Sequence, residues 1–219
     1  MADICVAAIH LCRIRATRLD ALGNPSPGPN NVYVSDNPIM LSVTPEIEAG
    51  EDKTLVGGCD CIVASYRGKD KLKRFNLEFD SAVIEPGLLE MLTGGAAILD
   101  GSGQDPIGMW FANQLSCSAD SAPNVAFEAW QDLWEDDHQL AAPYQYLHWI
   151  WPSTYWQLGD VTLQNDFNQP KLTGFSRGNP VWGEGIYGDL PEAAQPLGGF
   201  FYTDEIPDAA CGWQSFAIT

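Results

Sequence analysis

The 219-residue sequence predicts a mainly β protein, one compact β-rich domain with a single short helix and one long hairpin. Three observations lead to this prediction. Apolar and polar residues alternate in short segments, and a period of two indicates a strand with one buried face. The 21 glycines and 15 prolines supply many turns between such segments. A helical pattern stands out in a single place.

The long hairpin runs from Ile39 to Phe79, within a hairpin region that we place at residues 36–79. Its outgoing strand is Ile39–Glu48, followed by a mobile, acidic and glycine-bearing excursion over Ala49–Asp60. The return strand shows the alternation most clearly, with Phe75, Leu77 and Phe79 on one face. This layout favours a hairpin that docks on a neighbouring molecule over a catalytic cleft.

The helix is predicted at Pro86–Thr93. Proline suits the first turn of a helix, three leucines form an apolar stripe, and Gly94 and Gly95 end the segment as a left-handed cap does. Such a short helix is stable only when it packs on a sheet.

The remaining strands are predicted from the same alternation and from turn residues between them. A glycine-rich loop is expected at Asp100–Pro106, and a two-residue turn at Gly159–Asp160 is expected to lead into another strand. Residues 178–219 are expected to form a Gly/Pro-rich C-terminal extension. The predicted strands are Ile4–Leu19, Val32–Val34, Ala96–Leu99, Asn124–Trp134, Tyr144–Leu158 and Val161–Leu163, and the chain is expected to return once more from Asn165 through Lys171 to Ser176.

The charge is unbalanced, with 29 acidic and 11 basic residues and a net charge of −18. Affinity for nucleic acid comes largely from Lys and Arg, so this balance argues against a surface that grips phosphates. It is compatible with a channel through which DNA passes without adhering. Between Arg74 and Lys171 the charged residues are all acidic. This segregation suggests subunits that meet positive edge to negative edge.

Cysteine usage and hydropathy predict neither a metal site nor membrane insertion. Cys59 and Cys61 are too close for the usual zinc spacing, so we expect the six cysteines to be free thiols in a reducing compartment. Met1–Leu11 lacks the basic start and the apolar run of a signal peptide. No segment has the roughly 18 apolar residues that a membrane span needs.

No residue set in the sequence predicts catalysis or a cofactor. Glu128 and Asp132, among tryptophans, resemble a glycosidase carboxylate pair, but on a strand they lie about 13 Å apart, too far for either glycosidase geometry. We interpret them as a wet acidic edge beside core aromatics. His10, His138 and His148 have no nucleophile motif around them. The prediction is therefore that the protein is not an enzyme.

Several runs, in order, are similar to major tail tube proteins of long, non-contractile-tailed bacteriophages that infect actinobacteria. Each run is unspecific alone, and their order along most of the chain carries the resemblance. The runs are Leu41–Glu51, Leu72–Phe79, Pro86–Gly95, Asp160–Phe167 and Thr173–Gly183.

The resemblance implies a single tail-tube-like β domain over residues 1–219, a β-sandwich or barrel flanked by one short helix. It also implies a structural virion protein whose hexameric rings stack into a tube with an acidic lumen. It implies that inner strands pair between subunits and that a long hairpin reaches the next ring. The expected partners are further copies of the chain, the tape measure, terminator and tail-tip proteins, and DNA in passage. The expected location is the virion, with the host cytoplasm during assembly.

The expected functional residues are two charged sets, and the alternative for both is an ordinary solvated face. The residues expected to supply acidic lumen or loop charge are Glu46, Glu48, Glu51 and Asp52. Those expected at inter-subunit contacts are Lys69, Lys71, Lys73, Arg74, Arg13 and Arg15.

Three other functions stay open at this point. A tail terminator or head–tail connector shares the same fold. A secreted carbohydrate-binding β-sandwich is disfavoured by the absence of a signal peptide and by the unpaired cysteines. A hydrolase would require turnover that depends on Glu128.

Overall fold

The computed structural model describes residues 6–100, 106–111, 123–135, 137–161, 169–179, 181, 184–185, 188–189, 196–208 and 211–216. It confirms the predicted fold class: a mainly β protein with a large antiparallel sheet and, in the described part of the chain, one α-helix. No helix in these ranges is long and apolar enough to cross a membrane.

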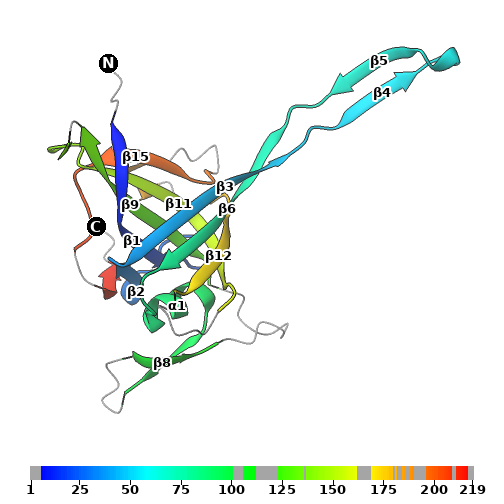
Figure 1. The fold of residues 1–219 in the computed structure, drawn as a ribbon. Helices are drawn as coiled ribbons and strands as arrows, with labels where there is room; N and C mark the ends of the chain where they lie inside the picture. The colour runs from blue at the N-terminus through cyan, green and yellow to red at the C-terminus, as the bar shows by residue number, and fades with distance from the viewer. Residues whose placement is uncertain are drawn as a thin grey trace.

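Ten strands form the main antiparallel sheet (Figure 1). In addition to the continuous path of eight strands, β10 (His138–Gln139) pairs with β9, and β15 (Gly199–Thr203) pairs with the first half of β11. The path runs through β16 (Gly212–Phe216), β2 (Gly28–Ser35), β1 (Ala7–Arg18), β9 (Val125–Glu135), β11 (Tyr146–Leu158), β12 (Lys171–Ser176), β6 (Lys71–Ser81) and β3 (Pro38–Glu48).

The sheet curls so that β3, β6 and β12 cross in front of β1, β9 and β11 in the view of Figure 1. Leu77 and Phe79 of β6, the inward residues of the predicted alternation, are buried between these layers. The ring of Phe79 lies edge-on to Phe127 of β9 at 5.7 Å and to Trp156 of β11 at 6.4 Å between centroids. This aromatic cluster forms the centre of the core.

Helix α1 spans Pro86–Thr93, as predicted. Its apolar side is buried against the core through Leu88, Leu89, Met91 and Leu92. Gly94 ends the helix in the left-handed conformation (φ 74°), and its N–H donates to the Glu90 carbonyl at 3.0 Å. The helix lies at the end of the curled sheet opposite the N-terminus in Figure 1.

The C-terminal segment is not simply an extension, contrary to the prediction for residues 178–219. Two of its strands complete the main sheet, because Tyr202 pairs with Leu147 on β11 and Trp213 pairs with Tyr33 on β2. Two short strands, β13 (Glu184–Gly185) and β14 (Gly188–Asp189), pair with each other. The Phe200-Phe201-Tyr202 run, with its β-favouring residues, supplies one of the added strands.

Besides the β13–β14 pair, two hairpins lie outside the main sheet in the described part of the chain. In the first, β7 (Ala96–Leu99) pairs with β8 (Pro106–Trp110); β8 begins where the predicted loop ends, and residues 101–105 lie outside the described ranges. After β11, Val161 is not in a strand, and the rest of the strand predicted there is likewise not described. The second hairpin continues β3 and β6 and is the most conspicuous feature of Figure 1.

Candidate functional site

The second hairpin forms an arm that projects away from the curled sheet (Figure 1). Its strands β4 (Asp52–Val56) and β5 (Ile62–Arg67) pair from Asp52–Arg67 to Val56–Ile62, and a short 3-10 turn at Gly58–Asp60 joins them. Every residue of both strands is exposed. Within the segment predicted as a mobile excursion, Ala49–Asp60, residues Asp52–Val56 instead form one strand of an antiparallel ladder. With neither face buried, it has no alternation to reveal a strand.

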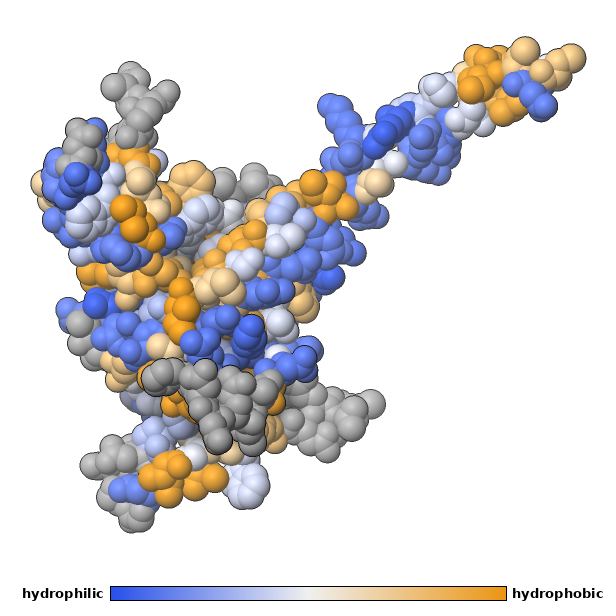
Figure 2. Space-filling model, viewed as in Figure 1, coloured by the Kyte–Doolittle hydropathy of each residue, from blue (hydrophilic) through white to orange (hydrophobic). Residues whose placement is uncertain are grey.

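The end of the arm is apolar, and we call the set Leu55, Val56, Ile62 and Val63 the arm tip. These four side chains are between 51% and 67% exposed. Figure 2 shows hydrophobic colour at the far end of the arm and hydrophilic colour along its middle. Aliphatic side chains gathered at the end of a polar projection mark a contact site, since covering each contributes about 1.5–3 kcal/mol.

The arm leaves the sheet where two glycines cross. A Cβ on Gly50 would lie 2.1 Å from the Gly68 carbonyl oxygen, so the close approach requires glycine at position 50. The Gly68 N–H donates to the Glu51 carbonyl at 2.8 Å, and the Gly50 N–H donates to Asp70 Oδ1 at 2.9 Å. These bonds fix the direction of the arm relative to the sheet.

At the root of the arm, residues from the two predicted charged sets pair with each other. Lys73 Nζ donates to Glu46 Oε1 at 2.9 Å, and Arg74 Nε donates to Glu46 Oε2 at 2.6 Å. The hydrogen bonds from Lys73 and Arg74 lower the pKa of Glu46 to about 2. Glu46 was expected to supply lumen charge and the two cations were expected to contact another subunit. In the single chain they instead form one cluster across the hairpin.

The other predicted arm residues are more open. Glu48, Asp52, Lys69 and Lys71 are exposed. Glu51 is also exposed and accepts from Lys53, with 3.0 Å between Nζ and Oε1. Their placement is compatible both with a contact surface and with a solvated face.

The predicted inter-subunit role of Arg15 is wrong for the folded chain, because this side chain is buried. Arg15 Nε donates to Glu128 Oε2 at 2.6 Å and Nη2 donates to Oε1 at 2.7 Å. Arg13, on the same strand, is half-buried, and its guanidinium donates to the Pro207 carbonyl. Both arginines are therefore engaged within their own chain.

Glu128 is fully buried, so the prediction of a wet acidic edge at this position is also wrong. His148 Nε2 lies 3.1 Å from Glu128 Oε1, and the His148 ring stacks on Trp130 at 4.1 Å. Burial alone would raise the pKa of Glu128, but the charge of Arg15 and the hydrogen bond with His148 outweigh it and lower this pKa to about 2. We call Arg15, Glu128, Trp130 and His148 the buried polar cluster.

The sequence contains one signal for this cluster. Every residue of the run Val125–Trp130 except Glu128 is apolar, as in a strand covered on both faces, and a charged residue within such a strand needs a partner. In the structure this run is buried at every position. Arg15 sits directly across from Glu128 in the β1–β9 ladder. The cluster is enclosed by the fold, and it offers no access for a substrate at the Glu128 carboxylate.

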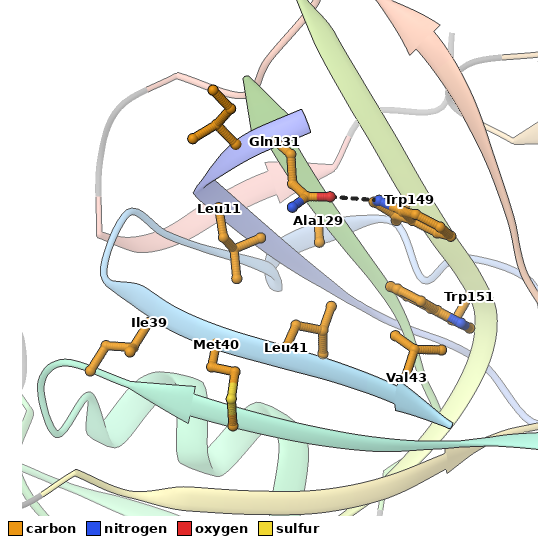
Figure 3. A pocket seen from close by; sticks show the side chains of 10 residues that line it. Leu11, Ile39, Met40, Leu41, Val43, Ala129, Gln131, Trp149 and Trp151 are labelled. Carbon is orange, nitrogen blue, oxygen red and sulfur yellow. Dashed lines mark hydrogen bonds between the residues drawn. The ribbon is translucent and has the colours of Figure 1, made fainter. Parts of the chain in front are cut away.

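A groove opens between β3 and the layer formed by β1, β9 and β11 (Figure 3). Its volume is about 370 Å³, and most of the lining is apolar. Trp149 Nε1 donates to Gln131 Oε1 at 2.9 Å on its wall, so these two polar groups satisfy each other. Ile9, Ile39 and Met40 lie at its mouth and are between 42% and 49% exposed. The lining is Ile9, Leu11, Ile39, Met40, Leu41, Val43, Ala129, Gln131, Trp149 and Trp151.

Within the described ranges, no three His, Cys, Asp or Glu side chains come together in a way that could hold a metal ion. A comparison with protein-family models gives no match for this chain, and neither does a comparison with curated proteins. The functional argument therefore rests on the arm, the groove and the charge.

Proposed function

We propose that this protein is a structural virion protein, the subunit of a phage tail tube, and that copies of it assemble through the arm. The observation that carries the proposal is the arm itself: an ordered hairpin, exposed on both faces, with four aliphatic side chains at its end. Within a single chain this arrangement buries nothing. A second molecule that covers the tip supplies the stabilisation that the isolated chain lacks.

The sequence runs that resemble tail tube proteins support this class over other self-assembling proteins. The charge supports it as well, because a net charge of −18 repels the DNA backbone and a tube for DNA passage must not retain its cargo. A β subunit that meets its neighbours in closed rings also covers the free sheet edges that otherwise cause aggregation.

The test is negative-stain electron microscopy of the purified protein at rising concentration. We expect rings with a central hole that stack into tubes. Rings that never stack would favour a terminator or connector of the same fold. A protein that stays monomeric at every concentration would overturn the proposal, and glycan binding in that state would favour a carbohydrate-binding module.

A further inference from the structure

The groove lies beside two strand edges that carry free backbone groups. β3 is the last strand in the order of the main sheet, so no strand of the described ranges pairs with its outer edge. On β1, the pairing with β2 covers Ile14–Thr17 only, and in the described part of the chain no strand pairs with that side of Ala7–Arg13. Ile9 of β1 and Ile39 and Met40 of β3 stand at the mouth between these segments.

These features define what can occupy the groove. An unpaired edge is satisfied by a strand, because only a strand offers N–H and C=O groups at matching intervals. The apolar lining requires aliphatic side chains. Filling it leaves Trp149 Nε1 and Gln131 Oε1 satisfied, since these two atoms already bond to each other. The fitting occupant is thus an extended segment with aliphatic side chains.

The arm tip has both properties. It lies on two strands that pair with each other and, among the described residues, with no other strand, and its four side chains are aliphatic and exposed. Its charge also suits the approach to a second copy. Residues 49–70 contain four acidic and three basic residues, a net charge of −1, and the 25 acidic and eight basic residues elsewhere leave −17 on the rest of the chain. The arm is therefore close to neutral, and its approach to an acidic second copy adds little repulsion.

An arm cannot reach the groove of its own chain. The groove wall is the first half of β3, through Ile39–Val43, and the arm continues from the other end of the same strand and points away (Figures 1 and 3). We propose that the arm tip of one copy inserts into the groove of a second copy and pairs with the free edge of β3. This inference rests on the proposed function and names the acceptor surface for the arm.

The contact joins two different surfaces, so it is heterologous. Each copy has one tip and one groove, and such a contact propagates into a closed ring or an open filament instead of stopping at a dimer. Repetition of the contact between one tip and one groove is thus sufficient to build an assembly of many copies.

The test uses two full-length variants that each lose one half of the contact. The tip variant carries Leu55→Asp and Ile62→Asp, and the groove variant carries Ile39→Asp and Met40→Asp. All four positions are at least 42% exposed, so the charges remain in water in the monomer. Each variant alone should associate at least about a hundredfold more weakly than the wild type, because two apolar side chains lose their burial.

Mixing the two variants gives the decisive result. The groove variant keeps its tip and the tip variant keeps its groove, so an equimolar mixture should form a 1:1 complex by sedimentation velocity, with no growth beyond it. A photoreactive benzophenone amino acid at position 63 of the groove variant should crosslink to the β3 segment of the tip variant, identified by mass spectrometry. The matched control is Ile107→Asp, whose side chain is 68% exposed on β8, away from both surfaces; it should assemble like the wild type.

The outcomes separate the two proposals. Tubes that form normally from the tip variant or the groove variant would overturn the inference and leave the proposed function standing. Variants that are both monomeric and fail to combine would also overturn it. A wild-type chain that does not self-associate at any concentration would overturn both. Circular dichroism of each variant confirms that the fold is retained.

Discussion

At the scale of residues, the buried polar cluster is the most demanding feature of the core. Removing a carboxylate and a guanidinium from water is costly, and only close geometry compensates for that cost. Here two hydrogen bonds of 2.6 and 2.7 Å join Arg15 to Glu128, while Trp130 lies under the guanidinium at 5.2 Å and stacks on His148. The members come from three adjacent strands, so the cluster fixes the register of β1, β9 and β11.

Replacing Arg15 with Met should lower the free energy of unfolding by about 3–5 kcal/mol, because Glu128 would remain buried without its main counter-charge. Urea denaturation followed by tryptophan fluorescence measures this change. The control Arg177→Met, at an exposed position, should change the stability by less than about 1 kcal/mol. Equal effects from the two variants would show that the Arg15–Glu128 pair is not important for stability. The double variant Arg15→Met/Glu128→Leu should recover most of the loss.

Stability should also fall with acid through this cluster. The pKa of Glu128 in the folded chain is about 2, below the 4.5 of the free group, so the folded state binds its proton less readily than the unfolded chain does. The stabilisation is complete above about pH 4.5 and is lost as the pH falls toward 2. In Glu128→Gln the dependence of unfolding free energy on pH should be flatter across this window. An unchanged slope would exclude Glu128 as its source.

The sequence could not predict this cluster, because its partners are far apart in the chain. Glu128 and Arg15 are separated by 113 positions and meet only through the β1–β9 pairing. Their residue types alone indicated surface charge, which is where most charged residues lie. Only the burial of both faces of β9 distinguishes Glu128 from an acidic residue at a wet edge.

At the scale of elements, the sequence predicts those helices and strands whose bounds are set by interactions between neighbouring residues. The helix Pro86–Thr93 has the predicted bounds, since proline and a glycine cap act over a few residues. Strand β12 lies within the returning segment that was predicted from Asn165 to Ser176. The arm strands escaped prediction because exposure of both faces removes the alternation. β8 also escaped, since a glycine-rich approach and a proline start resemble a loop.

The glycine crossing at the base of the arm makes a specific prediction. Gly50→Ala places a Cβ against the Gly68 carbonyl, so the two chains must separate and the bond from Gly68 N–H to Glu51 must lengthen or break. Amide hydrogen exchange should accelerate by about tenfold or more in β4 and β5, a loss of at least 1.4 kcal/mol of local stability, while the core stays protected. The matched control is Gly58→Ala, which meets open space. Faster exchange in both variants would show that the close approach of Gly50 and Gly68 is not what stabilises the arm.

At the scale of the whole molecule, composition predicted the fold class and the uneven charge, but it could not reveal the groove. That surface exists because the sheet curls until its last strand, β3, lies near β1, and curl depends on the pairing of all the strands between them. Leu41 and Val43 carry the same alternation whether or not β1 is near. The groove therefore depends on the order in which the strands pair, which the local sequence pattern does not contain.

The cluster of Glu46, Lys73 and Arg74 can be used to test whether the two cations act within their own chain or at a contact with another subunit. Reversing both cations, with Lys73→Glu and Arg74→Glu, puts three acidic side chains together at the root and should reduce tube formation at least tenfold. If the pairing acts within the chain, adding Glu46→Lys should restore tubes, counted by electron microscopy. Continued failure of the triple variant would assign the two cations to a contact with another subunit, as the sequence first suggested. Normal tubes from the double variant would show that Lys73 and Arg74 are not needed for assembly.

The crossing of Gly50 and Gly68 also has a mechanical consequence. From Gly50 to Val56 the extended chain covers about 20 Å, so a rotation of about 10° at the crossing displaces the tip by about 3.5 Å. In a particle held together by such arms, the bending stiffness of the filament is set largely at this joint and much less in the rigid sheet. The persistence length of tubes, measured from their curvature in electron micrographs, would then report on two glycines and the hydrogen bonds that hold them.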